Sequence, residues 1–265
     1  MRVGYCQTEP VFGEVKQNLD AVSASLLKVG CDLMVLPELF ATGYQFVSKE
    51  EVESLAEPVP QGPTTQRLLE IARDRRMTLV AGLPERDGGR CYNSAVVVGP
   101  NGLIGCYRKV HLFFEETLFF TPGDGGFQVW DIGPGRIGVM VCFDWFYPEA
   151  ARTLALKGAD IICHPSNLVM PYCPDAMVTR CLENRLFSIT ANRIGAETRG
   201  GKKTLTFIGT SEVVTPRGEI LQRAPRDRAE VAVVEIDPSQ ARNKSLNTYN
   251  DLFRDRRPSA YRLES

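Results

Sequence analysis

The sequence predicts an α/β fold of four layers, a four-layer α-β-β-α sandwich in which two mixed sheets pack face to face. Two observations predict this architecture. Apolar runs of strand length alternate with segments of helical periodicity, and both halves of the chain follow the order strand, helix, strand, helix, strand, hairpin. Because each sheet would carry helices on only one face, its bare apolar face must be buried, and packing the two sheets together achieves this.

The first half opens with a strand, a helix and a second strand. Apolar residues at helical spacing predict the first helix: Val15, Leu19, Val22 and Leu26. A second helix is expected to begin at 62–64, with Thr64 as its N-cap. The turn residues 99–102 (Gly-Pro-Asn-Gly) predict a hairpin. The strands expected in this half are 2–7, 32–36, 78–83, 93–98 and 103–110.

The second half repeats this order. Pro148 suits a first helical turn and Gly158 a helix end, and between them Ala151, Leu154 and Ala155 share one face. Asp175 is expected to cap another helix, whose buried face would carry Val178, Cys181, Leu182 and Leu186. The strands expected here are 136–141, 161–163, 188–191 and the hairpin arms 207–214 and 219–223.

Composition excludes several classes of function. We expect a single domain over 1–265, because no Pro/Gly/Ser-rich linker divides the chain. With 31 basic and 32 acidic residues the net charge is −1, so no overall field attracts nucleic acid or an anionic membrane. No signal-peptide or membrane-span pattern is present, which predicts a cytoplasmic protein whose eight cysteines are reduced. With two histidines and no C-x-x-C pair, we expect no metal and no cofactor.

The segment 238–265 is predicted to be a C-terminal tail. It carries mixed charge and three spaced aromatic residues, Tyr249, Phe253 and Tyr261. This aromatic content argues against disorder and favours docking on a partner.

Polar side chains follow several of the expected strands. Cys142, Asp144, His164 and Asn167 all lie just after strands of the second half, and the carboxyl ends of parallel strands meet at one edge of a sheet. A thiol just before a helix N-terminus, which would favour its thiolate, is a candidate nucleophile. The alternative is that Cys142, like most cysteines beside apolar runs, is a small core residue.

Three segments in order resemble the catalytic motifs of the nitrilase, or carbon-nitrogen hydrolase, superfamily. They are 36–40 (Leu-Pro-Glu-Leu-Phe), 107–113 (Tyr-Arg-Lys-Val-His-Leu-Phe) and 141–144 (Val-Cys-Phe-Asp). Further similar segments, including 92–94 and 164–167, extend the likeness over nearly the whole chain. The resemblance implies the same α-β-β-α fold and a hydrolase that cleaves non-peptide carbon–nitrogen bonds.

The resemblance also implies roles for individual residues. Cys142 would attack the substrate, Glu38 would act as general base, and Lys109 would stabilise negative charge. Glu116 occupies the place of a second family glutamate, although the adjacent Glu115 leaves this register open. Tyr44, Phe143, Trp145 and Asn167 are expected to line the substrate pocket.

Alternatives remain at this stage. His164 and Asn167 could instead form a Cys-His-Asn arrangement with Cys142, as in other thiol hydrolases. A protein that kept the fold as a binding scaffold is the non-enzymatic alternative. The family's usual assembly implies a homodimer or a larger homo-oligomer.

The substrate class is predicted from the residues after the nucleophile. True nitrilases often carry Cys-Trp-Glu, whereas this chain has Cys142-Phe143-Asp144, closer to the amidase and carbamoyl-hydrolase branches. Small archaeal members labelled nitrilase look similar to this chain. We therefore expect hydrolysis of a small amide to an acid and ammonia, with a nitrile or an N-carbamoyl compound as the alternative substrate.

Overall fold

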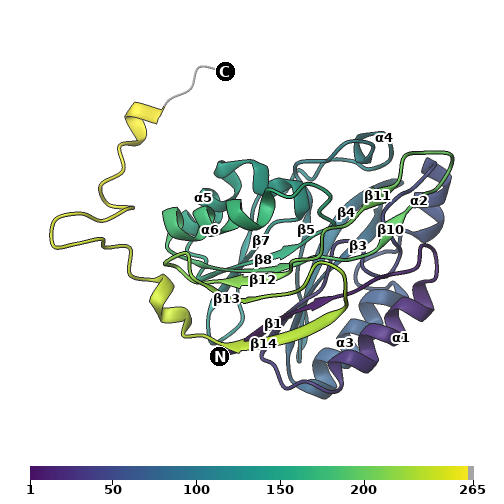
Figure 1. Cartoon of the computed structure of the whole chain (residues 1–265), viewed down its shortest axis with the longest axis horizontal. Helices are drawn as coiled ribbons and strands as arrows, with labels where there is room; N and C mark the ends of the chain where they lie inside the picture. The colour runs from purple at the N-terminus through teal and green to yellow at the C-terminus, as the bar shows by residue number, and fades with distance from the viewer. Residues whose placement is uncertain (262–265) are drawn as a thin grey trace.

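The computed structural model describes residues 1–261 and contains two six-stranded sheets (Figure 1). The first sheet has the order β14 (Glu230–Glu235), β1 (Arg2–Gln7), β2 (Leu33–Val35), β3 (Thr78–Asp87), β4 (Arg90–Gly99) and β5 (Gly102–Arg108). The second has the order β13 (Ile220–Arg223), β12 (Glu212–Val214), β9 (Phe187–Ala191), β8 (Ile161–Pro165), β7 (Arg136–Val139) and β6 (Val129–Asp131). A short ribbon pairs β10 (Ala196–Glu197) with β11 (Leu205–Thr206).

Both sheets are mixed, as predicted. In the first, β1, β2 and β3 are parallel and the flanking strands are antiparallel. In the second, β7, β8 and β9 are parallel and flanked in the same way. The parallel strands of each sheet are joined through helices, as parallel connections require.

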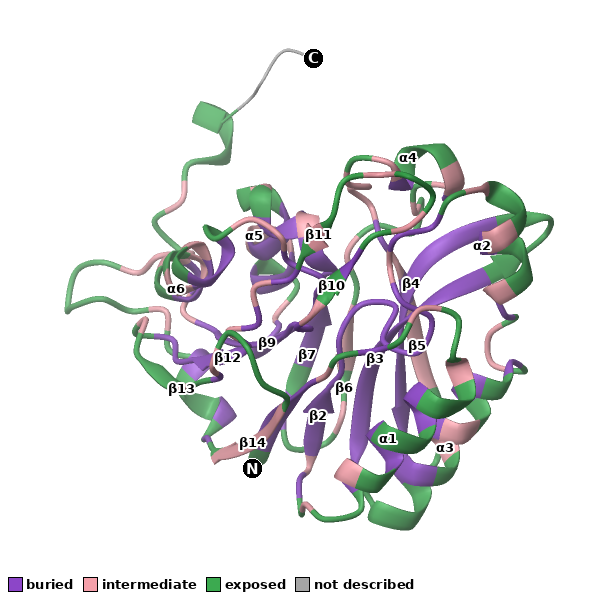
Figure 2. Ribbon diagram, turned by 45° about the vertical axis from the view of Figure 1, so that its right-hand side comes forward, coloured by how far each residue is buried: buried purple, intermediate pink, exposed green. Residues whose placement is uncertain are grey.

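Helices cover the outer faces, and the sheets pack against each other. The longer helices are α1 (Val15–Leu26) and α3 (Pro63–Arg75) on the first sheet, and α5 (Pro148–Leu156) and α6 (Cys173–Asn184) on the second. The shorter ones are α2 (Lys49–Leu55), α4 (Glu116–Phe119), η1 (Cys142–Phe146), η2 (Pro238–Ala241) and η3 (Pro258–Tyr261). Figure 2 shows buried strands in the middle and helices with exposed outer faces. The four-layer prediction is confirmed.

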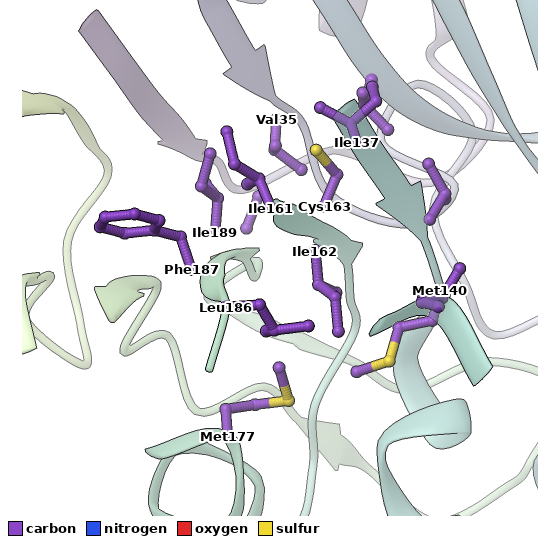
Figure 3. Packing of buried hydrophobic residues seen from close by; sticks show 14 of the residues in the cluster. Val35, Ile137, Met140, Ile161, Ile162, Cys163, Met177, Leu186, Phe187 and Ile189 are labelled. Carbon is purple, nitrogen blue, oxygen red and sulfur yellow. The ribbon is translucent and has the colours of Figure 1, made fainter. Parts of the chain in front are cut away.

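The core between the sheets is apolar. Residues of alternating strand positions, such as Val35 of β2, meet Ile161 and Cys163 of β8 in one cluster (Figure 3). A second cluster fills the space between the first sheet and its helices. Both clusters are built from the alternating and helical patterns in the sequence.

Two predicted helix caps are wrong. The backbone N–H groups of Thr64 and Thr65 donate to the Glu57 carboxylate at 3.0 and 2.9 Å, so a side chain seven residues upstream satisfies the start of α3. Asp175 lies inside the first turn of α6, because that helix begins at Cys173 and the fixed φ of Pro174 suits a first turn.

The predicted buried face of α6 is wrong in part. Leu182 is 50% exposed, and the buried stripe of this helix runs instead through Cys173, Met177 and Cys181. The stripe follows i, i+4, i+8 spacing, which places Leu182 beside it rather than within it.

Predicted strands differ in extent at two places, and the first of these forms a hairpin that was not predicted. Strands β3 and β4 are longer than expected and are joined by Gly88 and Gly89, both of which have positive φ. The expected strand 207–214 belongs to its sheet only at Glu212–Val214, because Gly209 and Thr210 also have positive φ and interrupt the extended chain. Helix α2 and the edge strands β6 and β14 were not predicted.

The C-terminal tail leaves the sandwich (Figure 1). Phe253 is half-buried, with the Arg152 guanidinium and the Lys244 ammonium over its ring, whereas Tyr249 is 85% exposed. The last four positions of the predicted tail, 262–265, lie outside the described residues. Over the described part of the chain, none of the helices combines the length and the apolar character needed to span a bilayer.

Candidate active site

The three residues to which the resemblance gives catalytic roles lie in one buried cluster. Glu38 follows β2, Lys109 follows β5 and Cys142 follows β7. Their exposed fractions are 0%, 1% and 5%. Gly82 of β3 permits this arrangement, because a Cβ there would lie 2.5 Å from the Glu38 Cα. The close approach of β3 to the segment that carries Glu38 therefore requires glycine at this position.

Lys109 lies between two carboxylates. Its Nζ is 2.7 Å from Glu38 Oε1 and 2.8 Å from a carboxylate oxygen of Glu116. Asn93 Nδ2 donates to the same Glu38 oxygen at 2.7 Å, and the Tyr44 hydroxyl donates to Glu116 at 2.6 Å. A buried cation is stabilised only when it is paired in this way, so the cluster holds Lys109 charged and fixed.

The structure distinguishes the two adjacent glutamates. Glu116 opens α4 and points to Lys109, and it also accepts from the backbone N–H of Phe113 at 3.2 Å. Glu115 points away and pairs with Lys202 at 2.7 Å, where both side chains are partly exposed. Of the two, Glu116 is therefore the residue that contacts the cluster.

Cys142 occupies a sharp turn between β7 and the short helix η1. Its φ is +42°, which is unusual for a residue with a side chain. The Asp144 carboxylate secures this turn, since it accepts from the Val141 backbone N–H at 2.8 Å and from the Tyr107 hydroxyl at 2.7 Å. It also accepts from His111 Nδ1 at 2.7 Å. Asp144 thus ties the cysteine turn to the segment that carries Lys109.

His164 contacts the backbone of Cys142. Its Nε2 lies 3.0 Å from the Cys142 carbonyl oxygen, and its Nδ1 lies 3.1 Å from Thr190 Oγ1. Burial lowers the pKa of His164 to about 4, so the ring is neutral. A carbonyl oxygen can only accept, so Nε2 carries the proton and has no free lone pair. His164 therefore positions the Cys142 backbone and does not accept the thiol proton through Nε2.

Burial controls the charges of the reacting groups. It raises the pKa of Glu38 to about 7 against the opposing attraction of Lys109. Burial by itself would lower the pKa of Lys109, but Glu116 and Glu38 together raise it. Burial and repulsion by Glu38 raise the pKa of the Cys142 thiol well above its ordinary value. The cysteine is therefore a thiol in the resting state and needs a base, contrary to the expectation that a helix terminus would favour its thiolate.

A narrow cavity reaches Cys142. Phe143, Trp145 and Asn167 line it, together with Phe113 and the segment 168–170. Tyr44 lines a neighbouring pocket beside Glu116. Sequence reasoning assigned no role to Asn93, whose only signal was its place in the Tyr-Asn-Ser segment 92–94. Within residues 1–261, no three His, Cys, Asp or Glu side chains are grouped to hold a metal ion.

The sequence model of the carbon-nitrogen hydrolase family matches residues 2–244 of this chain. The chain belongs to that family. Its members hydrolyse carbon–nitrogen bonds, so the chain is a carbon–nitrogen hydrolase, and the predicted resemblance is confirmed.

Individual relatives cover nearly the same length. A protein named nitrilase from Pyrococcus abyssi is 51% identical over 264 residues, which cover 98% of this chain and 99% of that protein. An (R)-stereoselective amidase from a Pseudomonas species is 38% identical over 229 residues, covering 85% and 80%. A solved structure of the amidase from Nesterenkonia sp. AN1 has a TM-score of 0.81 at 28% identity and covers 98% of each chain. In that structure, a glutamate-to-glutamine mutant, acrylamide has added to the active-site cysteine.

The adjacent glutamates of this carbon–nitrogen hydrolase provide a matched pair of variants. Glu116→Gln is expected to lower kcat/KM about 100-fold, because an amide cannot balance the charge of Lys109 in a buried site. Glu115→Gln removes only a partly exposed ion pair with Lys202 and should change kcat/KM less than about twofold. Ammonia release by the two purified variants checks this. Equal losses in both would contradict the assignment of Glu116.

Proposed function

We propose that this enzyme hydrolyses a small amide to a carboxylic acid and ammonia through a thioester on Cys142. The observation that carries the proposal is the buried thiol beside a carboxylate–lysine–carboxylate cluster. A thiol that must lose its proton, a carboxylate with a pKa of about 7 and a fixed cation are the parts that thiol-mediated acyl transfer needs.

In the first half-reaction, Glu38 takes the proton of the Cys142 thiol as Sγ attacks the amide carbon. The carbonyl oxygen becomes an oxyanion, which the ammonium of Lys109 and the backbone N–H of Phe143 stabilise. The carbon–nitrogen bond then breaks, Glu38 returns the proton to the leaving nitrogen, and ammonia departs. The acyl group remains on sulfur as a thioester.

In the second half-reaction, a water molecule attacks the thioester carbon. Glu38 takes a proton from this water, and a second oxyanion forms at the same place. The carbon–sulfur bond then breaks, the carboxylic acid leaves, and the proton returns to the Cys142 sulfur. Glu38 and Cys142 end in their starting forms, and Lys109 stays protonated throughout.

The unpartnered polar atoms near the cluster support an amide over a nitrile. Among residues 1–261, Glu38 Oε2 and Asn93 Oδ1 are buried acceptors that receive no hydrogen bond. A carboxamide nitrogen carries two N–H donors that match two acceptors, whereas a nitrile nitrogen carries none. An unsatisfied buried acceptor is costly, so a substrate that supplies donors binds better.

A panel of short amides, nitriles and N-carbamoyl amines tests this proposal. Ammonia release should be fastest with amides, and the acid product should be the only carbon-containing product. Release of carbon dioxide would instead identify a carbamoyl hydrolase, and faster turnover of nitriles would reverse the choice of substrate class. No release from any compound would overturn the proposal for small substrates.

The proposed base predicts the pH dependence. Glu38 must be ionised to accept a proton, and its pKa is raised to about 7. We therefore expect kcat/KM to rise about tenfold per pH unit below about pH 7 and to level off above it. Stopped assays between about pH 5 and 9 measure the rise of kcat/KM with pH and its plateau. A profile that is flat through neutral pH would exclude Glu38 as the base in the free enzyme.

We also propose a homodimer or larger homo-oligomer in the cytoplasm. The exposed aromatic residues of the tail support an assembly, since Tyr249 is 85% exposed and Tyr261 55%. The eight free cysteines support a reducing compartment. A light-scattering mass equal to the monomer at micromolar concentration would contradict the assembly.

A further inference from the structure

The cavity at Cys142 has a mostly apolar wall with one uncharged polar side chain. Apart from Cys142, its lining consists of Phe113, Phe143, Trp145, the segment 168–170 and Asn167. Its volume is about 10 Å³, which is the space that one water-sized group occupies. Only a small group can therefore enter this part of the site without displacing side chains.

Asn167 is unusual among the buried asparagines. It is 3% exposed, and neither Oδ1 nor Nδ2 has a hydrogen-bond partner within residues 1–261. In contrast, Asn192 uses both atoms, accepting from the Leu168 N–H at 2.8 Å and donating to the Gly209 carbonyl at 2.6 Å. Buried amides are almost always paired, so an amide with two free atoms indicates a missing partner.

Asn167 also lies next to the reacting sulfur. Asn167 and Cys142 line the same cavity. A group that pairs with the Asn167 side chain would therefore lie close to the carbon that Cys142 attacks. In a bound substrate, the group that lies there belongs to the acyl chain.

The charges near the cavity select against an ionised substrate group. Glu38 and Glu116 are acidic, and Lys109 already pairs with both of them. A carboxylate on the acyl chain would meet no cation among the described residues that line the cavity, and burying its charge would be costly. An ammonium group has no lone pair, so it would leave Asn167 Nδ2 without an acceptor. The missing partner is therefore a neutral group.

We propose that Asn167 recognises a hydroxyl group on the acyl chain, so that the preferred substrates are short hydroxy amides. A hydroxyl both donates and accepts, and so it satisfies Oδ1 and Nδ2 together. It also matches the size of the cavity, while the apolar wall packs against the carbon chain. The inference rests on the proposed amide hydrolysis and names the acyl group that this site takes.

Two pairs of amides of nearly equal shape test this proposal. Lactamide and isobutyramide differ by a hydroxyl in place of a methyl group, and 3-hydroxypropanamide and butyramide differ in the same way one carbon further out. The wild-type kcat/KM should favour the hydroxy member of at least one pair by about tenfold, because a buried polar site rejects an analogue that leaves it unpaired. Ratios of one or less in both pairs would overturn the proposal.

Variants distinguish recognition of an acyl-chain hydroxyl by Asn167 from a contact of Asn167 with the scissile amide. Asn167→Leu should abolish or invert the preference, because its loss of kcat/KM falls on the hydroxy amides more than on the apolar amides. The exposed Asn243 provides a control, since Asn243→Leu should keep the wild-type ratios. A uniform loss on all four amides in Asn167→Leu, with an unchanged thermal unfolding transition, would assign Asn167 to the scissile group and overturn the proposal.

A binding measurement distinguishes failure of this inference from failure of the proposed function. If none of the four amides releases ammonia, their protection of Cys142 against alkylation by iodoacetamide can still be compared. Protection at about tenfold lower concentration by a hydroxy amide than by its apolar partner would support the Asn167 site. Equal protection, or none, would overturn it.

Discussion

Cys142→Ala is expected to reduce ammonia release by at least about 10⁴-fold. The covalent pathway needs a sulfur nucleophile, and removal of the nucleophile of a catalytic triad has effects of this size. The side chain is small and lies at a turn that Asp144 secures through backbone and side-chain hydrogen bonds. The variant should therefore fold normally, with a circular dichroism spectrum and a thermal transition close to those of the wild type.

Cys6 supplies the matched control. It is another buried thiol, 1% exposed, in the cluster between the first sheet and its helices. Cys6→Ala should keep activity within about threefold, because its effect is limited to the modest packing loss of a small core substitution. If Cys142→Ala kept more than about a tenth of wild-type activity, or if Cys6→Ala abolished it, the assignment of the nucleophile would be wrong.

Lys109→Met is expected to cost both activity and stability. Methionine has a similar length but no charge, so it leaves the buried carboxylates of Glu38 and Glu116 without their cation. Breaking a buried pair from one side typically costs about 3–5 kcal/mol. Loss of the charge that stabilises the oxyanion should also lower kcat about 10³-fold. Urea unfolding and ammonia release measure the two effects.

The stability loss in Lys109→Met should depend on pH. Lys109 opposes the rise in the pKa of Glu38, so without the cation the folded-state pKa of Glu38 lies still further above its unfolded value, and ionising this group destabilises the fold. The loss should therefore be larger at about pH 8 than at about pH 5. Lys16→Met is the control, since Lys16 is 90% exposed and pairs with Asp20 at the surface; it should change stability by less than about 1 kcal/mol. A Lys109→Met loss below that limit would contradict the buried ion pair.

The sequence by itself determined the layer architecture, and it named Glu38, Lys109 and Cys142 as catalytic candidates. Alternating apolar runs and helical stripes report burial directly, because their periods of 2 and 3.6 residues place side chains on one face. Since parallel strands of one sheet share a carboxyl edge, Cys142, His164 and Asn167 could be placed together before any distance was known. Glu38 and Lys109 follow strands of the other sheet, and the resemblance to the carbon–nitrogen hydrolases joined them to Cys142.

Only the tertiary structure decided how those residues are held. Neighbouring positions 115 and 116 have the same chemistry in the sequence, and only the course of the chain into α4 directs Glu116 to Lys109 and Glu115 to Lys202. The cap of α3 also depends on tertiary structure, because the Glu57 carboxylate that accepts from its first N–H groups lies seven residues before Thr64.

The positive φ of Cys142 and the contacts of Asp144 also depend on tertiary structure. Local periodicity is set by the nearest neighbours along the chain, but hydrogen bonds and burial join residues that are far apart in sequence. The pKa of Glu38 and the unpaired amide of Asn167 follow from those distant contacts, and for that reason they appear only once the two sheets are packed together.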